Sequence, residues 1–153
     1  MNPMDYEIIL GINNHHHHWT LVVIYPHEKR SLFLDPLGES KKNIKQCLEI
    51  TRAFMRRKGC SVSRWTCDTV EHPKQPDSTS CGVFALKFAE RVLDKEPVDF
   101  PASRQAVNKL RFDIAVRLLQ SSDDLENLCH FCGEMDSEKD FNWVTTFYKY
   151  SKK

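Results

Sequence analysis

The stretch QPDSTSCGVFALKFAERVL, residues 75–93, decides the fold of this chain. It is a polar loop that ends in Ser80-Cys81-Gly82 and runs directly into an almost wholly apolar segment. Apolar residues on nearly every side predict a helix over Cys81–Leu93, buried at the centre of a domain. Cys81 then lies in the first turn, where unpaired backbone N–H groups and the positive end of the helix dipole favour a thiolate. The sequence therefore predicts a candidate nucleophile at position 81.

The composition bounds the class of protein. With 153 residues, of which 41% are hydrophobic, the chain is long enough for one domain with a real core. A net charge of +1 gives no argument for nucleic acid or an anionic membrane as a partner. No apolar run approaches the roughly 20 residues that span a bilayer, and the N-terminus lacks the pattern of a secretory signal. Six cysteines without such a signal indicate free thiols in a reducing compartment.

Hydrophobic periodicity places strands and helices around the central helix. We expect strands at residues 6–12, 19–25, 31–35 and 63–70, and amphipathic helices at 41–58 and 103–120. The strand at 19–25 is a near-continuous apolar run, typical of a strand covered on both faces. This order predicts an α+β domain, with a small mixed or antiparallel sheet flanked by helices. We place that domain at residues 1–120 and interpret 121–153 as an acidic appendage.

Two residues far from Cys81 in the sequence could complete a thiol site. His18 stands at the start of one predicted strand and Asp35 at the end of the next, with a short turn between the strands. Antiparallel pairing brings such positions to one edge of the sheet. A carboxylate there would fix the tautomer of the imidazole and stabilise the imidazolium. Gln75, six residues before Cys81, could direct an amide N–H at a developing oxyanion, beside the backbone N–H of Cys81.

Each motif alone has a plainer explanation. A Cys-Gly before an apolar helix is more often structural than catalytic, Asp-Pro-Leu-Gly is usually only a turn, and a histidine before a strand is usually a surface residue. The joint order of His18, Asp35, Gln75 and Cys81, in a compatible topology, favours the catalytic interpretation.

With these residues in place, the chain resembles the ubiquitin-like-protein (SUMO) protease family of cysteine peptidases. The motifs that carry the resemblance are HWTLVV at 18–23, LDPLG at 34–38, Gln75, and SCGVF at 80–84. The resemblance covers roughly residues 6–120 and implies a papain-like cysteine peptidase fold. It implies that His18 is the general base, Asp35 its orienter, Gln75 the oxyanion donor and Cys81 the nucleophile. Trp19 is expected to pack near the catalytic centre and to contribute to substrate binding, and a structural role as a large core anchor is compatible with that position.

The resemblance implies a thiol-dependent peptidase or isopeptidase that cleaves after the C-terminal diglycine of SUMO or a related ubiquitin-like modifier. No cofactor is expected. The expected partners are the modifier and its conjugates, with no nucleic acid and no membrane, and the protein is expected to be a monomer in the nucleus or cytoplasm. A catalytically inactive, modifier-binding or scaffold protein that retains part of the fold is the alternative from another class.

Three features depart from the family pattern. Family members usually carry several tens of additional residues before the His-Trp strand, so we expect a domain that lacks its usual N-terminal part. His15 to His17 are expected to be an exposed loop, with metal binding as the alternative. Cys129 and Cys132 form a Cys-x-x-Cys pair that would supply two of the four ligands of a structural zinc site. We assign no metal and interpret the pair as the remnant of a broken zinc finger, with a zinc-binding module as the third alternative.

Overall fold

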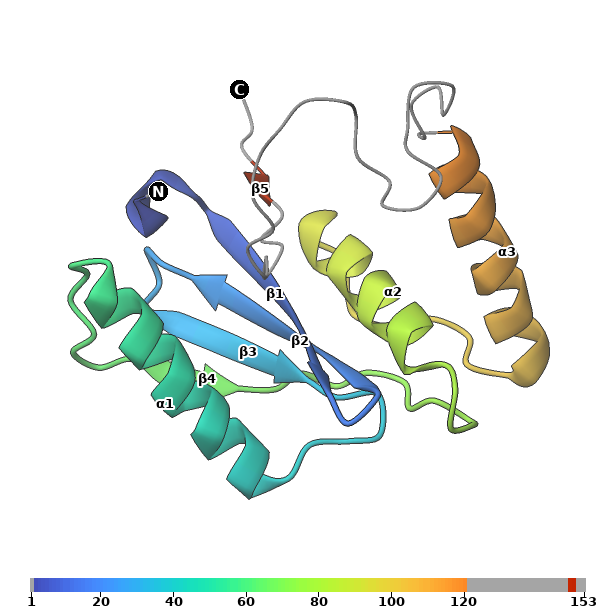
Figure 1. Cartoon of the computed structure of the whole chain (residues 1–153), viewed down its shortest axis with the longest axis horizontal. Coiled ribbons are helices and arrows are strands. Elements are labelled where there is room, and N and C mark those ends of the chain that lie inside the picture. Colours follow the sequence, from blue (N-terminus) through green and yellow to red (C-terminus); the bar gives the residue numbers. More distant parts are fainter. Residues whose placement is uncertain (1, 121–148, 151–153) are drawn as a thin grey trace, which may run out of the picture.

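A mixed sheet forms the centre of the computed structural model, which describes residues 2–120 and 149–150 (Figure 1). The sheet has the strand order β4-β3-β2-β1-β5. Its strands are β1 (Ile8–His15), β2 (His18–Tyr25), β3 (Arg30–Leu34), β4 (Thr66–Asp68) and β5 (Lys149–Tyr150). The first three form an antiparallel meander, and β4 joins β3 in parallel. The expected α+β class with a small mixed sheet is therefore confirmed.

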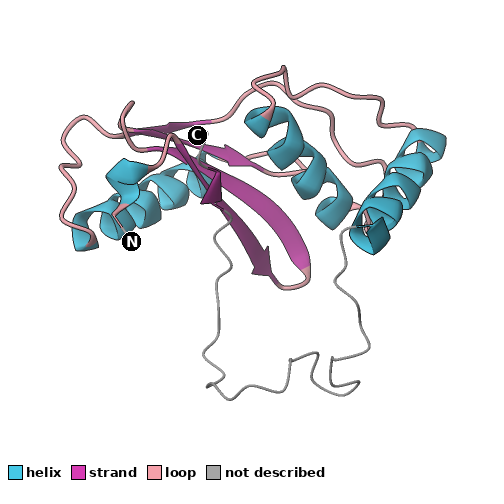
Figure 2. Ribbon diagram, turned by 90° about the horizontal axis from the view of Figure 1, so that it is seen from above, coloured by secondary structure: helices cyan, strands magenta, loops and turns pink. Residues whose placement is uncertain are grey.

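Helices cover both faces of this sheet. The helices are α1 (Lys41–Arg57), α2 (Cys81–Leu93) and α3 (Arg104–Gln120), and a short 3-10 turn, Pro3–Asp5, precedes β1. Helix α1 lies on one face and α2 on the other, with α3 packed on the outer side of α2 (Figure 2). The sheet is thus the middle of three layers, and β2, at its centre, is covered on both sides as its apolar sequence predicts.

Alternate side chains of β2 pack into two separate hydrophobic cores, one on each face of the sheet. Leu21 and Val23 are fully buried against α2. Ile24 faces the other way and packs with Met55 of α1 and with Trp65. Because strand side chains alternate between faces, one short strand anchors both layers.

Aromatic side chains hold α2 against the sheet. Phe84 and Phe88 are fully buried, one turn apart, with ring centroids 5.9 Å apart in an edge-on arrangement. Phe100, from the loop after α2, lies 5.2 Å from the ring of Phe84. Helix α2 begins at Cys81 and ends at Leu93 as predicted, although Leu86 is 44% exposed. Its buried residues follow the i, i+3, i+4 spacing of one face, so the helix is buried along that face and partly exposed along the other.

Helix α1 begins and ends as its sequence predicts. The Ser40 side chain accepts a hydrogen bond from the backbone N–H of Asn43, which caps the first turn. Gly59 follows the helix with a φ of +77°, and its N–H donates to the carbonyl of Arg56. The next N–H, of Cys60, donates to the carbonyl of Met55, which completes a Schellman C-cap.

Two predicted elements differ from the structure. The strand expected at 63–70 is only Thr66–Asp68, an edge strand rather than a core strand. The preceding residues form a turn in which Arg64 adopts a φ of +59° and the N–H of Trp65 donates to the carbonyl of Val62, so extended backbone starts later.

The apolar face predicted along residues 103–120 is covered over most of its length but not at its C-terminal end. Near the start of α3, Val107 is buried and Leu110 packs against the main core. Ile114 is half-buried, whereas Leu118, three turns after Val107, is 67% exposed. The 3.6-residue repeat identifies the helix, but it does not show how much of the helix length has a core to contact.

No helix in the described part of the chain is both long and apolar enough to cross a bilayer. Most of segment 121–153, with Cys129 and Cys132, lies outside the described residues. Its two described residues form β5, which pairs with β1 in antiparallel fashion. The boundary at residue 120 remains a prediction.

Candidate active site

The β2–β3 hairpin brings His18 and Asp35 together. Leu21 pairs with Leu34, so the start of β2 lies beside the end of β3. His18 Nε2 donates to Asp35 Oδ1 over 2.7 Å, and the carboxylate side chain is only 8% exposed. The predicted meeting of these two side chains is confirmed. Since Nε2 is engaged by the carboxylate, Nδ1 is the ring nitrogen left to exchange a proton with another group.

The turn after β3 fixes the Asp35 carboxylate. Oδ1 also accepts the backbone N–H of Leu37 at 2.8 Å. The N–H of Gly38 donates to the Asp35 carbonyl at 2.7 Å, and Gly38 has a φ of +100°, which favours glycine. The Asp-Pro-Leu-Gly turn therefore holds the carboxylate toward His18.

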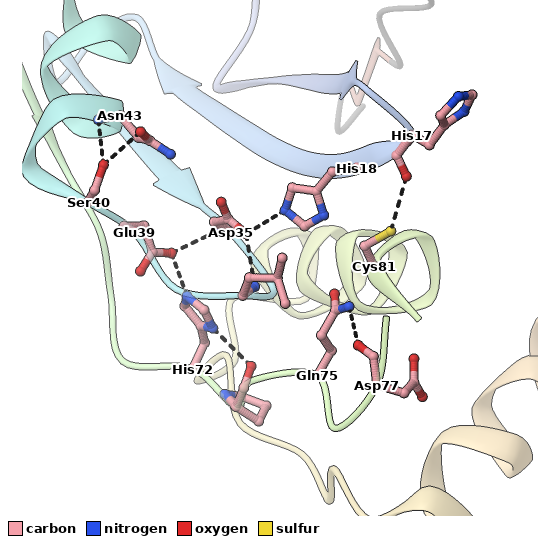
Figure 3. A network of polar contacts seen from close by, with 12 residues as sticks. His17, His18, Asp35, Glu39, Ser40, Asn43, His72, Gln75, Asp77 and Cys81 are labelled. Atoms are coloured by element: carbon pink, nitrogen blue, oxygen red, sulfur yellow. Dashed lines mark hydrogen bonds and ion pairs between the residues drawn. The ribbon is translucent and has the colours of Figure 1, made fainter. Parts of the chain in front are cut away.

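Cys81, from α2, lies beside His17, in the turn that joins β1 to β2. The thiol is buried and donates to the carbonyl oxygen of His17, with 3.9 Å between sulfur and oxygen. Figure 3 shows the His18 ring between Asp35 on one side and Cys81 on the other. Cys81 is the first residue of α2, so it stands at the helix N-terminus with the first backbone N–H groups of the helix.

Gln75 lies in the loop that approaches this cluster. Its backbone N–H donates to the carbonyl of Pro36 at 2.8 Å, which ties the loop to the turn after β3. Its side-chain Nε2 donates to the carbonyl of Asp77 at 2.5 Å. One of the two amide hydrogens is therefore occupied, and the other is the one that could reach an oxyanion.

Trp19 packs on the first turn of α2. A Cβ built on Gly82 would lie 3.6 Å from Cδ1 of the indole. The tryptophan thus contacts the residue next to Cys81, as predicted, but it is 40% exposed and does not serve as a core anchor. Its role in substrate binding remains a prediction.

His15 to His17 lie where β1 turns into β2. All three are exposed, as predicted, but His15 is the last residue of β1 rather than part of a loop. His16 and His17 form a two-residue turn with φ values of 49° and 63°. Across residues 2–120 and 149–150, no group of three or more His, Cys, Asp or Glu side chains could hold a metal ion. The metal alternative at Cys129 and Cys132 falls on residues that the structure does not describe.

Asp77, Ser80 and Arg111 hold the loop before Cys81, a role that the sequence did not predict. Asp77 accepts the N–H of Thr79 at 2.7 Å and the hydroxyl of Ser80 at 2.6 Å. These bonds, with that of Ser80 the strongest, lower the pKa of Asp77. From α3, Arg111 donates to the carbonyl of Thr79 at 3.1 Å and to the Ser80 hydroxyl at 3.0 Å. The run Asp-Ser-Thr-Ser was a usable turn signal, whereas nothing local identifies Arg111.

A second histidine–carboxylate pair, His72 with Glu39, was likewise not predicted from the sequence. His72 Nε2 donates to Glu39 Oε1 at 2.6 Å, and Nδ1 donates to the carbonyl of Pro73 at 3.0 Å. Burial alone would lower the pKa of His72, but these bonds and the negative charge of Glu39 and Asp35 raise it overall. Burial likewise opposes ionisation of Glu39, yet the His72 bond and the N–H of Asp35 lower its pKa. Both ring nitrogens face acceptors, an arrangement that favours the imidazolium form of His72 beside the carboxylate of Glu39.

This pair should make stability depend on pH. The raised pKa of His72 gives stability that is fully present below its ordinary value of 6.5 and is lost as the pH rises through the folded-state pKa. Urea unfolding at pH 5.5 and 8.5 should therefore show a fall in unfolding free energy that is larger for wild type than for His72→Gln. All other titratable groups are the same in the two proteins. An equal fall in the unfolding free energy of both would therefore contradict an ion pair between His72 and Glu39. Below pH 4.5, protonation of Glu39 should also weaken the ion pair.

Comparison with known proteins identifies the family. Residues 3–125 match the Ulp1 protease family, C-terminal catalytic domain. The chain belongs to the Ulp1 protease family. Over 107 residues it is 29% identical to human Sentrin-specific protease 2 and 27% identical to the rat protein. These alignments cover 65% of this chain but only 18% of each relative.

Solved structures of Ulp1-family proteases share the fold. The chain resembles the SUMO protease Ulp1 with its catalytic cysteine oxidised to a sulfonic acid, with a TM-score of 0.69 and 18% identity, over 78% of this chain and 56% of that one. The Ulp1 protease domain in complex with Smt3, the yeast ortholog of SUMO, matches with a TM-score of 0.67 and 19% identity, over 74% of this chain and 52% of that one. The Ulp1-like SUMO protease catalytic domain of Chaetomium thermophilum matches with a TM-score of 0.62 and 23% identity, over 79% of this chain and 49% of that one. The papain-like cysteine protease fold is thus confirmed, and the chain spans about half of these solved domains.

Proposed function

We propose that this chain is a thiol-dependent peptidase or isopeptidase that cleaves after the C-terminal diglycine of SUMO or a related ubiquitin-like modifier. The observation that carries the proposal is the 2.7 Å bond between His18 and Asp35, at the strand end next to the His17 carbonyl that Cys81 contacts. Membership of the Ulp1 protease family supports it, as do relatives named Sentrin-specific protease 2 and the Ulp1 domain in complex with Smt3.

The proposed reaction assigns one role to each residue. The Cys81 thiolate attacks the carbonyl carbon after the diglycine, and His18 holds the proton that the thiol has lost. The oxyanion accepts the backbone N–H of Cys81 and the second amide hydrogen of Gln75. His18 then protonates the leaving amine as the C–N bond breaks, which leaves a thioester on Cys81. Water, deprotonated by His18, hydrolyses the thioester and releases the modifier. Asp35 stabilises the imidazolium throughout.

The exposed indole of Trp19 contributes to this proposal as a substrate contact. It lies over Gly82, beside the nucleophile, where an extended diglycine tail would have to approach. A tail without side chains is the kind of substrate that could pass beneath a large ring and still bring its carbonyl to Cys81. We place this catalytic machinery within residues 1–120.

A covalent probe tests the proposal. A SUMO protein whose C-terminal carboxyl is replaced by an electrophile should label wild type at Cys81, as read by peptide mass spectrometry. Cys81→Ala should remain unlabelled. The matched control is Cys60→Ala, which removes a free, partly exposed thiol on the connection after α1 and should label like wild type.

The same probe separates the proposal from its alternative. If wild type stays unlabelled where the catalytic domain of human Sentrin-specific protease 2 reacts, the peptidase proposal fails. Retained binding of the modifier, measured by calorimetry on that unlabelled protein, would then support the inactive binding or scaffold protein.

A further inference from the structure

The Glu39–His72 pair lies beside Asp35, on the side away from His18 (Figure 3). The side chains of Glu39 and His72 are 9% and 2% exposed, so both are almost sealed from water. A buried ion pair loses hydration and is therefore weak evidence for a stabilising role. Its position relative to the site is more informative.

One oxygen of Glu39 reaches the residue that orients the proposed base. Oε1 accepts the backbone N–H of Asp35 at 2.7 Å and the Nε2–H of His72 at 2.6 Å. Asp35 in turn accepts from His18 through its side chain. A series of contacts therefore connects His18 to His72, first through the side chain and backbone of Asp35 and then through Glu39.

The other end of this series is fixed to the loop that carries Gln75. His72 donates to the carbonyl of Pro73, and its ring lies 4.7 Å from that of Phe88 in α2. The N–H of Gln75 donates to Pro36, in the turn after Asp35. The loop and the turn are thus joined twice, once through backbone and once through the buried pair.

We propose that Glu39 and His72 are positioning residues for the proposed peptidase. They join the turn that carries Asp35 to the loop that carries Gln75. The orienting carboxylate and the oxyanion donor, which lie 40 positions apart in sequence, are thereby held in one arrangement. This inference rests on the proposed function.

Kinetics on a SUMO protein with a fluorogenic amide after its diglycine tests the inference. Glu39→Ala removes both acceptor contacts and should lower kcat by about tenfold to a hundredfold, with KM changed less than threefold. Glu39→Gln keeps an amide oxygen that accepts the same two hydrogens, so it should recover at least half of the lost rate on a logarithmic scale. His72→Phe should lower kcat to a similar degree, and the double variant Glu39→Ala/His72→Phe no further, because the two residues act as a unit.

Controls separate positioning from general destabilisation. Glu28→Ala, which removes an exposed carboxylate paired with Arg30 at the opposite end of β3, should leave kcat within twofold of wild type. All rates are measured at a temperature where urea titration shows each variant to be folded. A change of less than twofold in Glu39→Ala, or a rise in KM with kcat intact, would overturn the inference.

A second measurement keeps the inference testable if wild type does not cleave the substrate. Alkylation of Cys81 by iodoacetamide at pH 6, followed by mass spectrometry, reports the coupling between the thiol and His18 without any modifier. The rate should fall at least threefold in Glu39→Ala and recover in Glu39→Gln. Equal rates in all three proteins would overturn the positioning role, whereas failure of cleavage alone would overturn only the proposed function.

Discussion

His18→Gln is expected to lower kcat/KM for diglycine cleavage by about a thousandfold. Glutamine can still donate a hydrogen bond to Asp35, so the buried carboxylate keeps a partner. It cannot, however, take the proton of Cys81 or return it to the leaving amine. The loss should therefore fall mainly on kcat, as measured with the fluorogenic substrate, while the unfolding free energy changes little.

The run of four histidines supplies a matched control for this prediction. His15→Gln makes the same chemical change three residues earlier, at an exposed position that pairs with His18 across the hairpin. It should leave kcat/KM within about twofold of wild type. Retention of more than a tenth of the wild-type kcat/KM by His18→Gln, or an equal loss in both variants, would contradict the role proposed for His18.

Phe84→Ala is expected to destabilise the protein by about 3–5 kcal/mol. The ring is fully buried between the sheet and α2 and contacts Phe88 and Phe100, so its loss removes apolar burial and leaves a cavity. Urea unfolding followed by tryptophan fluorescence measures the change. For many domains this is a large part of the total stability.

Phe112→Ala is the control for the effect of ring removal. Phe112 lies on α3 and is 69% exposed, so the same substitution should change the unfolding free energy by less than about 0.5 kcal/mol. Comparable destabilisation by the two variants would show that the aromatic cluster is not the core of the fold.

Local sequence determined most of the site because the chemistry lies at element ends. The bounds of α2 followed from an apolar run after a polar loop, and the meeting of His18 with Asp35 followed from a short turn between two strands. Both inferences need only neighbouring residues and the geometry of a hairpin. The role of each residue remains a prediction that the experiments above address.

What the sequence did not predict depends on contacts between distant segments. The Glu39–His72 pair joins positions 33 residues apart, and Arg111 reaches the loop before Cys81 from another helix. No periodicity or local motif encodes such pairings. The error at residues 63–70 has a different, local origin: a turn at Arg64, in which the N–H of Trp65 donates to the carbonyl of Val62, makes the extended backbone start later.

The parallel pairing of β3 with β4 has a consequence for how the protein folds. It joins Arg30 to Thr66 around the whole of α1, so it closes a long loop, and long-range pairings of this kind form slowly. The thiol of α2 follows still later in the chain and reaches the hairpin only when α2 docks on β2. A partly folded or newly synthesised chain would therefore hold Cys81 apart from His18. The proposed catalytic residues therefore come together only through contacts between segments that are far apart in the chain.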